Sequence, residues 1–238
     1  MGSSVAVLAL MVALGSLALL LLAGPGTRMA WWTFRTGLGL LGYAAYGGIA
    51  AVALAVIGIV LGLLFGGRVL VAGLALLVGL AAFVPPYLFH RTARALPPIH
   101  DISTDTDDPP RFVAIAPLRK DAANPMEYGG PEVAAQQHRA YPDIRPATLP
   151  EPPPRAFERA VAAARAQGWE IVDAAPAEGR IEATDTTSWF GFKDDVVLRV
   201  RPEGTGSRVD VRSLSRVGRG DVGKNAARIR AYLRALGS

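Results

Sequence analysis

Three long apolar runs dominate the first hundred residues of the chain. The runs span residues 5–22, 37–65 and 69–89, and none of them contains a charged side chain. A helix needs about 20 residues to cross a bilayer core of about 30 Å, and backbone groups in lipid must pair within their own segment. The pattern therefore predicts an anchor of three transmembrane helices within residues 1–96.

Two questions remain: whether the first run is retained, and where the third run ends. The first run resembles a signal peptide in position, but it has no basic stretch before it and exceeds the usual apolar length of about 7–15 residues. We therefore favour a helix that is retained over one that is cleaved. The third run is expected to close at Pro85 and Pro86, since proline ends or kinks helices, followed by His90 and Arg91.

Small residues recur on one face of the second run. They are Gly47, Ala51, Ala55, Gly58, Gly62 and Gly66. Steps of three or four residues keep them on one side of a helix, and small side chains let a second helix approach closely. The packing partner is either another helix of this chain or a helix of another protein. Because the three runs hold no ionisable residue, transport is disfavoured.

The charges divide the chain into two unlike parts. Residues 1–100 hold five arginines and no acid, so the whole net charge of +5 belongs to them and the remainder is neutral. A nucleic-acid-binding domain would carry its basic excess on the folded part, and no nucleic-acid partner is predicted. Trp31, Trp32 and Phe34 lie between the first two runs and fit an aromatic belt at a membrane interface.

The second part of the chain has the pattern of a small folded domain. Helices are expected at residues 132–140, 155–167 and 222–236, and strands at residues 111–116, 169–174, 180–187, 195–201 and 208–217. Residues 97–110 are predicted to be a solvated tether and 117–154 a proline-rich covering loop. The expected fold class is α+β: an N-terminal bundle of three transmembrane helices, followed by a domain at 111–238 with an antiparallel β-meander packed against two helices.

Alternation along these strands predicts one apolar face and one solvated face. Glu182, Arg199, Asp210 and Arg212 fall on the polar face, where they are expected to pair across strands. Exposed pairs of this kind contribute little to stability, about 0–1 kcal/mol.

One stretch, residues 187–195, mixes aromatic bulk and charge more tightly than any other in the soluble part. Its candidates for contact with a ligand or partner are Trp189, Phe190, Phe192, Lys193, Asp194 and Asp195. Paired carboxylates can act as acid and base. However, neighbours at the start of a strand point to opposite faces, which weakens a catalytic pair, and we predict no catalytic residue.

A glycine pattern lies before the last predicted helix. Residues 218–223 match G-x-G-x-x-G, but too few residues follow for a second parallel strand, so a dinucleotide site is excluded. Asp221 is instead expected to be the N-cap of the last helix. An anion site near that helix start is possible on chemical grounds. Its residues would be Arg216, Arg219, Asp221 and Lys224.

Neither a cofactor nor a metal is predicted. The chain has no cysteine and only three scattered histidines, which leaves no thiolate site or nucleophilic cysteine. The pair Asp105 and Asp107 has the spacing of a calcium loop, but the glycine and the closing glutamate of that motif are missing.

Several motifs in order resemble a known family. They are PPIHDIST at 97–104, AYPDI at 140–144, GWEI at 168–171, TSWFGFKDD at 187–195 and residues 213–229. Together they resemble the bacterial and plastid family catalogued as domain of unknown function 1499. The resemblance implies no activity. It implies a membrane-tethered domain on the periplasmic or lumenal side, whereas the arginine distribution favours the cytoplasm.

These observations favour an integral membrane protein of the bacterial inner membrane with a periplasmic domain. We expect a membrane-tethered interaction or accessory protein, with membrane lipids and, as a further candidate, another membrane protein as partners. One alternative is an apolar-ligand or lipid-binding domain, which requires a cavity between the sheet and the last helix. Another is a hydrolase using Asp194 or Asp195.

Overall fold

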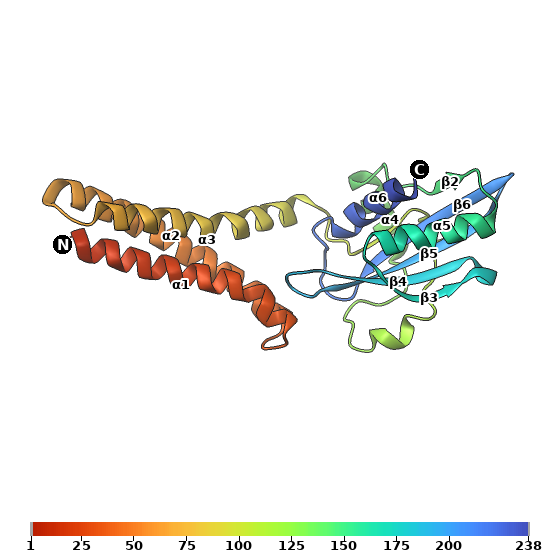
Figure 1. Ribbon diagram of the computed structural model, residues 1–238, viewed down its shortest axis with the longest axis horizontal. Coiled ribbons are helices and arrows are strands. Elements are labelled where there is room, and N and C mark those ends of the chain that lie inside the picture. Colours follow the sequence, from red (N-terminus) through yellow and green to blue (C-terminus); the bar gives the residue numbers. More distant parts are fainter. Residues whose placement is uncertain (1, 238) are drawn as a thin grey trace. The chain divides into compact units, whose positions relative to one another are not determined.

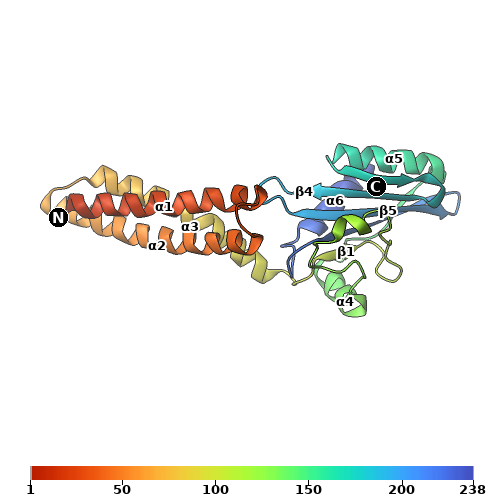
Figure 2. The same cartoon turned by 90° about the horizontal axis from the view of Figure 1, so that it is seen from below.

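The computed structural model describes residues 2–237 and divides into two compact units. The first unit ends at Arg94 and also includes residues 188–191, and the second contains the rest of the chain. The first unit holds three helices, shown in Figures 1 and 2: α1 (Gly2–Arg28), α2 (Phe34–Phe65) and α3 (Val69–Ala95). All three are long and apolar enough to cross a membrane, as the apolar runs predict.

The small residues of α2 pack against the other helices of the same chain. Ala51, Ala55, Gly58 and Gly62 are buried. A Cβ atom built on Gly58 would lie 3.3 Å from the Ala6 nitrogen in α1 and 3.3 Å from the Ala72 Cβ in α3. The middle of the predicted seam therefore serves the bundle itself.

The last residue of the seam and the end of α3 differ from this pattern. Gly47 is half-buried but also packs on α1, because a Cβ atom there would collide with the Ser16 hydroxyl. Gly66 is exposed and ends α2 with a φ of +74°. The prediction that Pro85 and Pro86 close the third helix is wrong, because α3 continues through both of them to Ala95. Each proline lacks an N–H but still fits helical φ, so the helix loses hydrogen bonds without ending.

The second unit is an antiparallel sheet with helices, which confirms the α+β class. Its strand order is β1-β6-β5-β4-β3, and β2 also pairs with β6. The strands are β1 (Asp101–Ser103), β2 (Ala147–Leu149), β3 (Glu170–Ala175), β4 (Arg180–Thr186), β5 (Lys193–Glu203) and β6 (Gly206–Ser215). The helices are α4 (Gly130–Ala140), α5 (Pro153–Ala166) and α6 (Lys224–Leu236), with short 3₁₀ turns η1 (Ala116–Arg119) and η2 (Pro176–Glu178).

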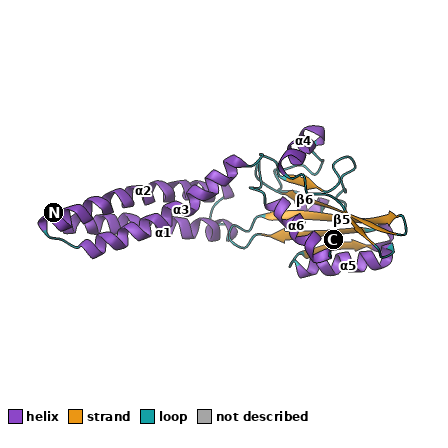
Figure 3. Ribbon diagram, turned by 90° about the horizontal axis from the view of Figure 1, so that it is seen from above, coloured by secondary structure: helices purple, strands orange, loops and turns teal. Residues whose placement is uncertain are grey.

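The apolar core lies on the face of the sheet that α5 and α6 cover (Figure 3). Trp169 stacks on Tyr232 of α6 with 5.1 Å between ring centroids. Twelve core residues have 0% exposed surface: Ile102, Ala156, Ala160, Ala164, Ile181, Val196, Val209, Val211, Ala226, Ile229, Tyr232 and Leu236. A water-sized cavity beside them would expose some of their surface. The cavity that an apolar-ligand domain requires is therefore absent between the described residues of the sheet and α6.

Two predictions for the start of this unit are wrong. Residues 97–110 are not a solvated tether, because β1 pairs with β6 and Ile102 is fully buried. Residues 111–116 form turns that lead into η1 instead of a strand. The folded unit therefore begins earlier than 111, with an irregular segment between β1 and α4.

Candidate functional site

The second face of the sheet is charged and buried, which corrects the prediction of a solvated face. Glu182, Asp195 and Asp210 have 0% exposed surface, and Arg212 has 3%. Residues 104–128, here named the cover segment, lie over this face and are held to it by hydrogen bonds (yellow-green in Figure 1). Ion pairs and hydrogen bonds to backbone groups make much of this contact, and Ile115 of the cover segment is also fully buried.

Glu182 on β4 anchors the middle of the cover segment. Its Oε1 accepts the backbone N–H groups of Val113 and Ala114 at 2.8 and 3.0 Å, and its Oε2 accepts that of Ile115 at 2.8 Å. Arg180 on the same strand pairs with the carboxylate. Since residues 113–115 belong to no strand, one side chain satisfies three N–H groups that would otherwise need water.

Asp195 on β5 anchors the next turn through two arginines. Arg119 of η1 pairs with its Oδ2, and Arg216 donates to both carboxylate oxygens at 2.8 and 2.9 Å. The same arginines also donate to backbone carbonyls of the cover segment, at Asn124 and Leu118. A buried carboxylate with two cations and a further hydrogen bond from Thr184 is fully satisfied.

Arg212 on β6 holds the cover segment at two points. Its guanidinium makes a two-pronged pair with Asp101 at 2.9 and 2.7 Å and donates to the carbonyls of Pro110 and Met126. The rings of Phe112 and Tyr128 lie 5.1 and 5.5 Å from it, within cation–π range. Burial raises the pKa of Asp101, although Arg212 acts in the opposite direction.

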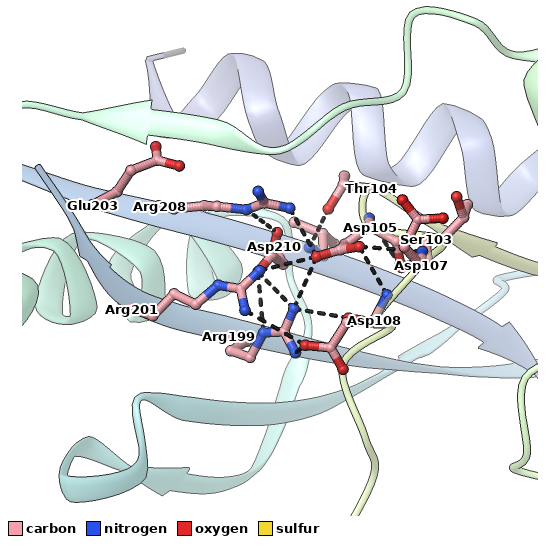
Figure 4. Close-up of polar contacts among 12 residues, drawn as sticks. Ser103, Thr104, Asp105, Asp107, Asp108, Arg199, Arg201, Glu203, Arg208 and Asp210 are labelled. Carbon is pink, nitrogen blue, oxygen red and sulfur yellow. Dashed lines mark hydrogen bonds and ion pairs between the residues drawn. The ribbon is translucent and has the colours of Figure 1, made fainter.

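Asp105, near the start of the cover segment, is the centre of a cluster of ion pairs with β5 and β6 (Figure 4). Its Oδ2 pairs with Arg199, Arg201 and Arg208 at 3.2, 2.9 and 2.8 Å. Its Oδ1 accepts the N–H groups of residues 107 and 108. Burial alone would raise the pKa of Asp105, but these hydrogen bonds and arginines outweigh it and lower the pKa. The carboxylate is thus fully used as an anchor, and Asp210 pairs with the same arginines.

Asp194 and Asp195 point to opposite faces of β5, as strand alternation predicts. Asp194 pairs with Arg228 of α6 at 2.6 Å, on the side of the apolar core. Each carboxylate is buried and neutralised by arginine. The two are not a catalytic pair, and the hydrolase hypothesis loses the geometry on which it rests.

The structure separates the other candidates of the 187–195 stretch. Trp189 and Phe190 belong to the first unit, whereas Phe192 and Lys193 belong to the second. Trp189 is 41% exposed and Phe190 is buried. Lys193 is exposed at the start of β5. The six residues are therefore divided between the two units.

The residues of the predicted anion site have different surroundings. Arg216 is engaged with Asp195, while Arg219 and Lys224 are exposed. Asp221 accepts the N–H groups of Gly223 and Asn225 at 2.8 and 2.7 Å, so it caps α6 from outside although the helix begins at Lys224. Burial raises the pKa of Asp221.

Sequence reasoning missed the partners of these anchors. Alternation places Glu182 and Arg212 on one face of the sheet, but nothing local connects them to residues 101–128. The buried or partly buried polar residues that were not singled out from the sequence are Asp101, Arg119, Asn124, Gln137, Asn225 and Arg228. In residues 2–237 no group of three or more His, Cys, Asp or Glu side chains is placed to hold a metal ion.

A comparison with protein-family models supports the resemblance seen in the motifs. The model described as "Protein of unknown function (DUF1499)" matches residues 101–236, which is more than half of the chain. No curated protein matches the chain. The match begins at β1 and therefore includes the cover segment and all of its anchors.

Proposed function

We propose that this chain, which belongs to the DUF1499 family of proteins of unknown function, is a membrane-anchored interaction or accessory protein. Its contact surface would be the cover segment. One observation carries this proposal: in the second unit, the large apolar side chains that stand exposed among the described residues are Val113 and Leu118, at 56% and 53%. Both lie on the cover segment, five positions apart.

The way the cover segment is held supports a role in recognition. Between Thr104 and Tyr128 its backbone is irregular apart from η1, yet buried charges at Glu182, Asp195 and Arg212 fix it. Burying charge is costly unless every group is paired. Loops held by a rigid scaffold commonly carry binding residues, and a fixed loop loses little conformational freedom when a partner binds.

The anchor indicates where that partner would be. Three helices that can span a membrane restrict the chain to that membrane. A partner in the same membrane meets it at a raised effective concentration, so a modest apolar contact is sufficient. We therefore propose another membrane protein as the partner.

We further propose the bacterial inner membrane, with the second unit on the periplasmic side. The family resemblance supports this side. Arg28, Arg35, Arg91 and Arg94 against Arg68 favour the cytoplasm, but short-loop charge bias of this size is a weak determinant.

Site-specific photo-crosslinking in native membranes tests the partner surface. A photoreactive residue at Val113 or Leu118 is expected to yield one and the same protein adduct. The matched control is Glu158, which is exposed on α5, and there we expect no such adduct. In the double variant Val113→Asp and Leu118→Asp, the photoreactive residue is placed at position 120 instead. We expect the adduct to be lost from this variant. Adducts no more specific at 113 and 118 than at 158 would contradict the proposal.

A further inference from the structure

The first unit contains a short segment from the distant part of the chain, residues 188–191. Within this unit the segment packs on the ends of α1 and α2. The Arg28 guanidinium donates a hydrogen bond to the Ser188 carbonyl. A Cβ atom on Gly24 would lie 2.6 Å from the indole of Trp189, and one on Gly37 would lie 3.1 Å from the ring of Phe190.

Small residues are required at these contacts. Gly24 has no side chain, which lets the indole of Trp189 lie directly on α1. Gly191 has a φ of +70°, and a Cβ atom there would lie 3.0 Å from the Arg28 side chain. Glycine adopts this backbone region without strain. The segment is thus shaped to fit the end of α1.

The contact lies where the bundle changes from apolar to polar. The uncharged run of α1 ends at about Leu22, and Arg28 and the pair Trp31 and Trp32 follow. Trp32 donates its indole N–H to the Ala23 carbonyl at 3.2 Å, and its ring lies 6.0 Å from that of Trp31. Tryptophan and arginine at such a boundary are typical of the lipid headgroup region.

We propose that Trp189 is a lipid-contacting anchor that lies in the headgroup region of the bilayer beside Trp31. Its indole is 41% exposed and that of Trp31 is 59% exposed, so both present free surface next to the helix ends. The indole combines an apolar body with one N–H donor, which matches the mixed chemistry of glycerol and carbonyl groups. Arg28 adds a positive charge that suits anionic headgroups.

Tryptophan fluorescence of the full chain in vesicles tests this assignment. The probe is a variant in which Trp31, Trp32 and Trp169 are each replaced by Phe, which leaves Trp189 alone. It is reconstituted in phosphatidylcholine and phosphatidylglycerol vesicles whose acyl chains carry bromine near the glycerol. Bromine quenches indoles that touch it, and we expect quenching comparable to that of a Trp31-only variant.

A Trp169-only variant is the matched control, because Trp169 is 5% exposed and stacked on Tyr232 in the core of the second unit. Quenching of Trp189 no greater than that of Trp169 would overturn the proposal. Should the triple variant fail to fold, the native chain and Trp189→Phe are compared instead. Replacement must then remove part of the lipid-quenched emission, and an unchanged quenched fraction would again overturn it. The result is independent of crosslinking at 113 and 118.

Discussion

Glu182 shows how a single side chain can hold an irregular segment on a sheet. Its carboxylate accepts three successive N–H groups from residues 113–115 and is fully buried. A hydrogen bond to a charged group contributes about 1.5–3 kcal/mol. The fixed position of Val113 therefore depends on a residue almost seventy positions later in the chain.

Glu182→Gln should loosen this part of the cover segment. The amide keeps one acceptor oxygen, but its NH₂ group opposes a backbone N–H, and the expected loss is about 1–3 kcal/mol. Amide hydrogen exchange in the full chain should speed up over residues 113–115. Glu178→Gln is the control, since that side chain pairs with the same Arg180 but is 61% exposed, and it should change little. Equal protection in both variants would refute the anchoring role.

The ion pairs of Asp105 should make the stability of the first residues of the cover segment depend on pH. The pKa of Asp105 is lowered in the folded chain from 3.8, so its stabilising effect is complete above that value and is lost as pH falls through the lower folded pKa. After correction for intrinsic rates, exchange at residues 107 and 108 should rise on acidification. Asp105→Asn should show the faster exchange at neutral pH and flatten the pH response. Asp121→Asn, at an exposed position, should retain it.

Local alternation was sufficient to predict some of these residues and not others. It predicts that Asp194 and Asp195 diverge, and it places Glu182 on the polar face. It does not predict burial, because the cover comes from residues 104–128, which have no regular pattern of their own. The predicted pairing of Arg199 with Asp210 across two strands is confirmed. Its predicted exposure to solvent is wrong for the same reason, because protein covers Asp210.

At the level of elements, α2 and α3 depend on a close approach at glycine. A Cβ atom on Gly48 would lie 2.8 Å from the Gly79 carbonyl oxygen and 2.9 Å from the Phe83 nitrogen. Both neighbours are backbone atoms, so the helices must separate to accommodate a side chain. Small residues at helix contacts in membranes serve this purpose.

Gly48→Val should therefore destabilise the bundle. Overpacking of this kind costs about 1–3 kcal/mol, and a lower thermal midpoint of the detergent-solubilised chain would reveal it. Gly42→Val is the control in the same helix, because a Cβ atom there meets nothing within 4 Å. If both substitutions lowered the midpoint equally, intrinsic helix propensity and not packing would be the cause.

The lengths of the elements explain which of them the pattern predicted. The apolar runs of α1 to α3 and the alternation of β4 to β6 extend over many residues, so their type was predicted correctly. β1 and β2 have three residues each, which is too short for a period to be visible. The predicted end of α3 at Pro85 and Pro86 was wrong for a different reason. A membrane-length helix tolerates the hydrogen bonds that proline removes when it packs in a bundle.

For the whole molecule, the number of membrane spans determines where its ends lie. If all three helices span, the start of α1 and the second unit lie on opposite sides of the membrane. The chain contains no cysteine, so a single introduced cysteine reports its own location without background. Ser4 lies near the start of α1, and Glu127 lies in the cover segment. Both residues are exposed.

Ser4→Cys and Glu127→Cys should therefore be labelled from opposite sides by a maleimide that does not cross membranes. In intact cells with permeable outer membranes we expect Glu127→Cys to react and Ser4→Cys to react only after the inner membrane is opened. The reverse order would place the second unit in the cytoplasm, in agreement with the arginine count, and would contradict the periplasmic proposal while leaving three spans intact. Reaction of both cysteines from one side would instead mean that one of the three helices does not span the membrane.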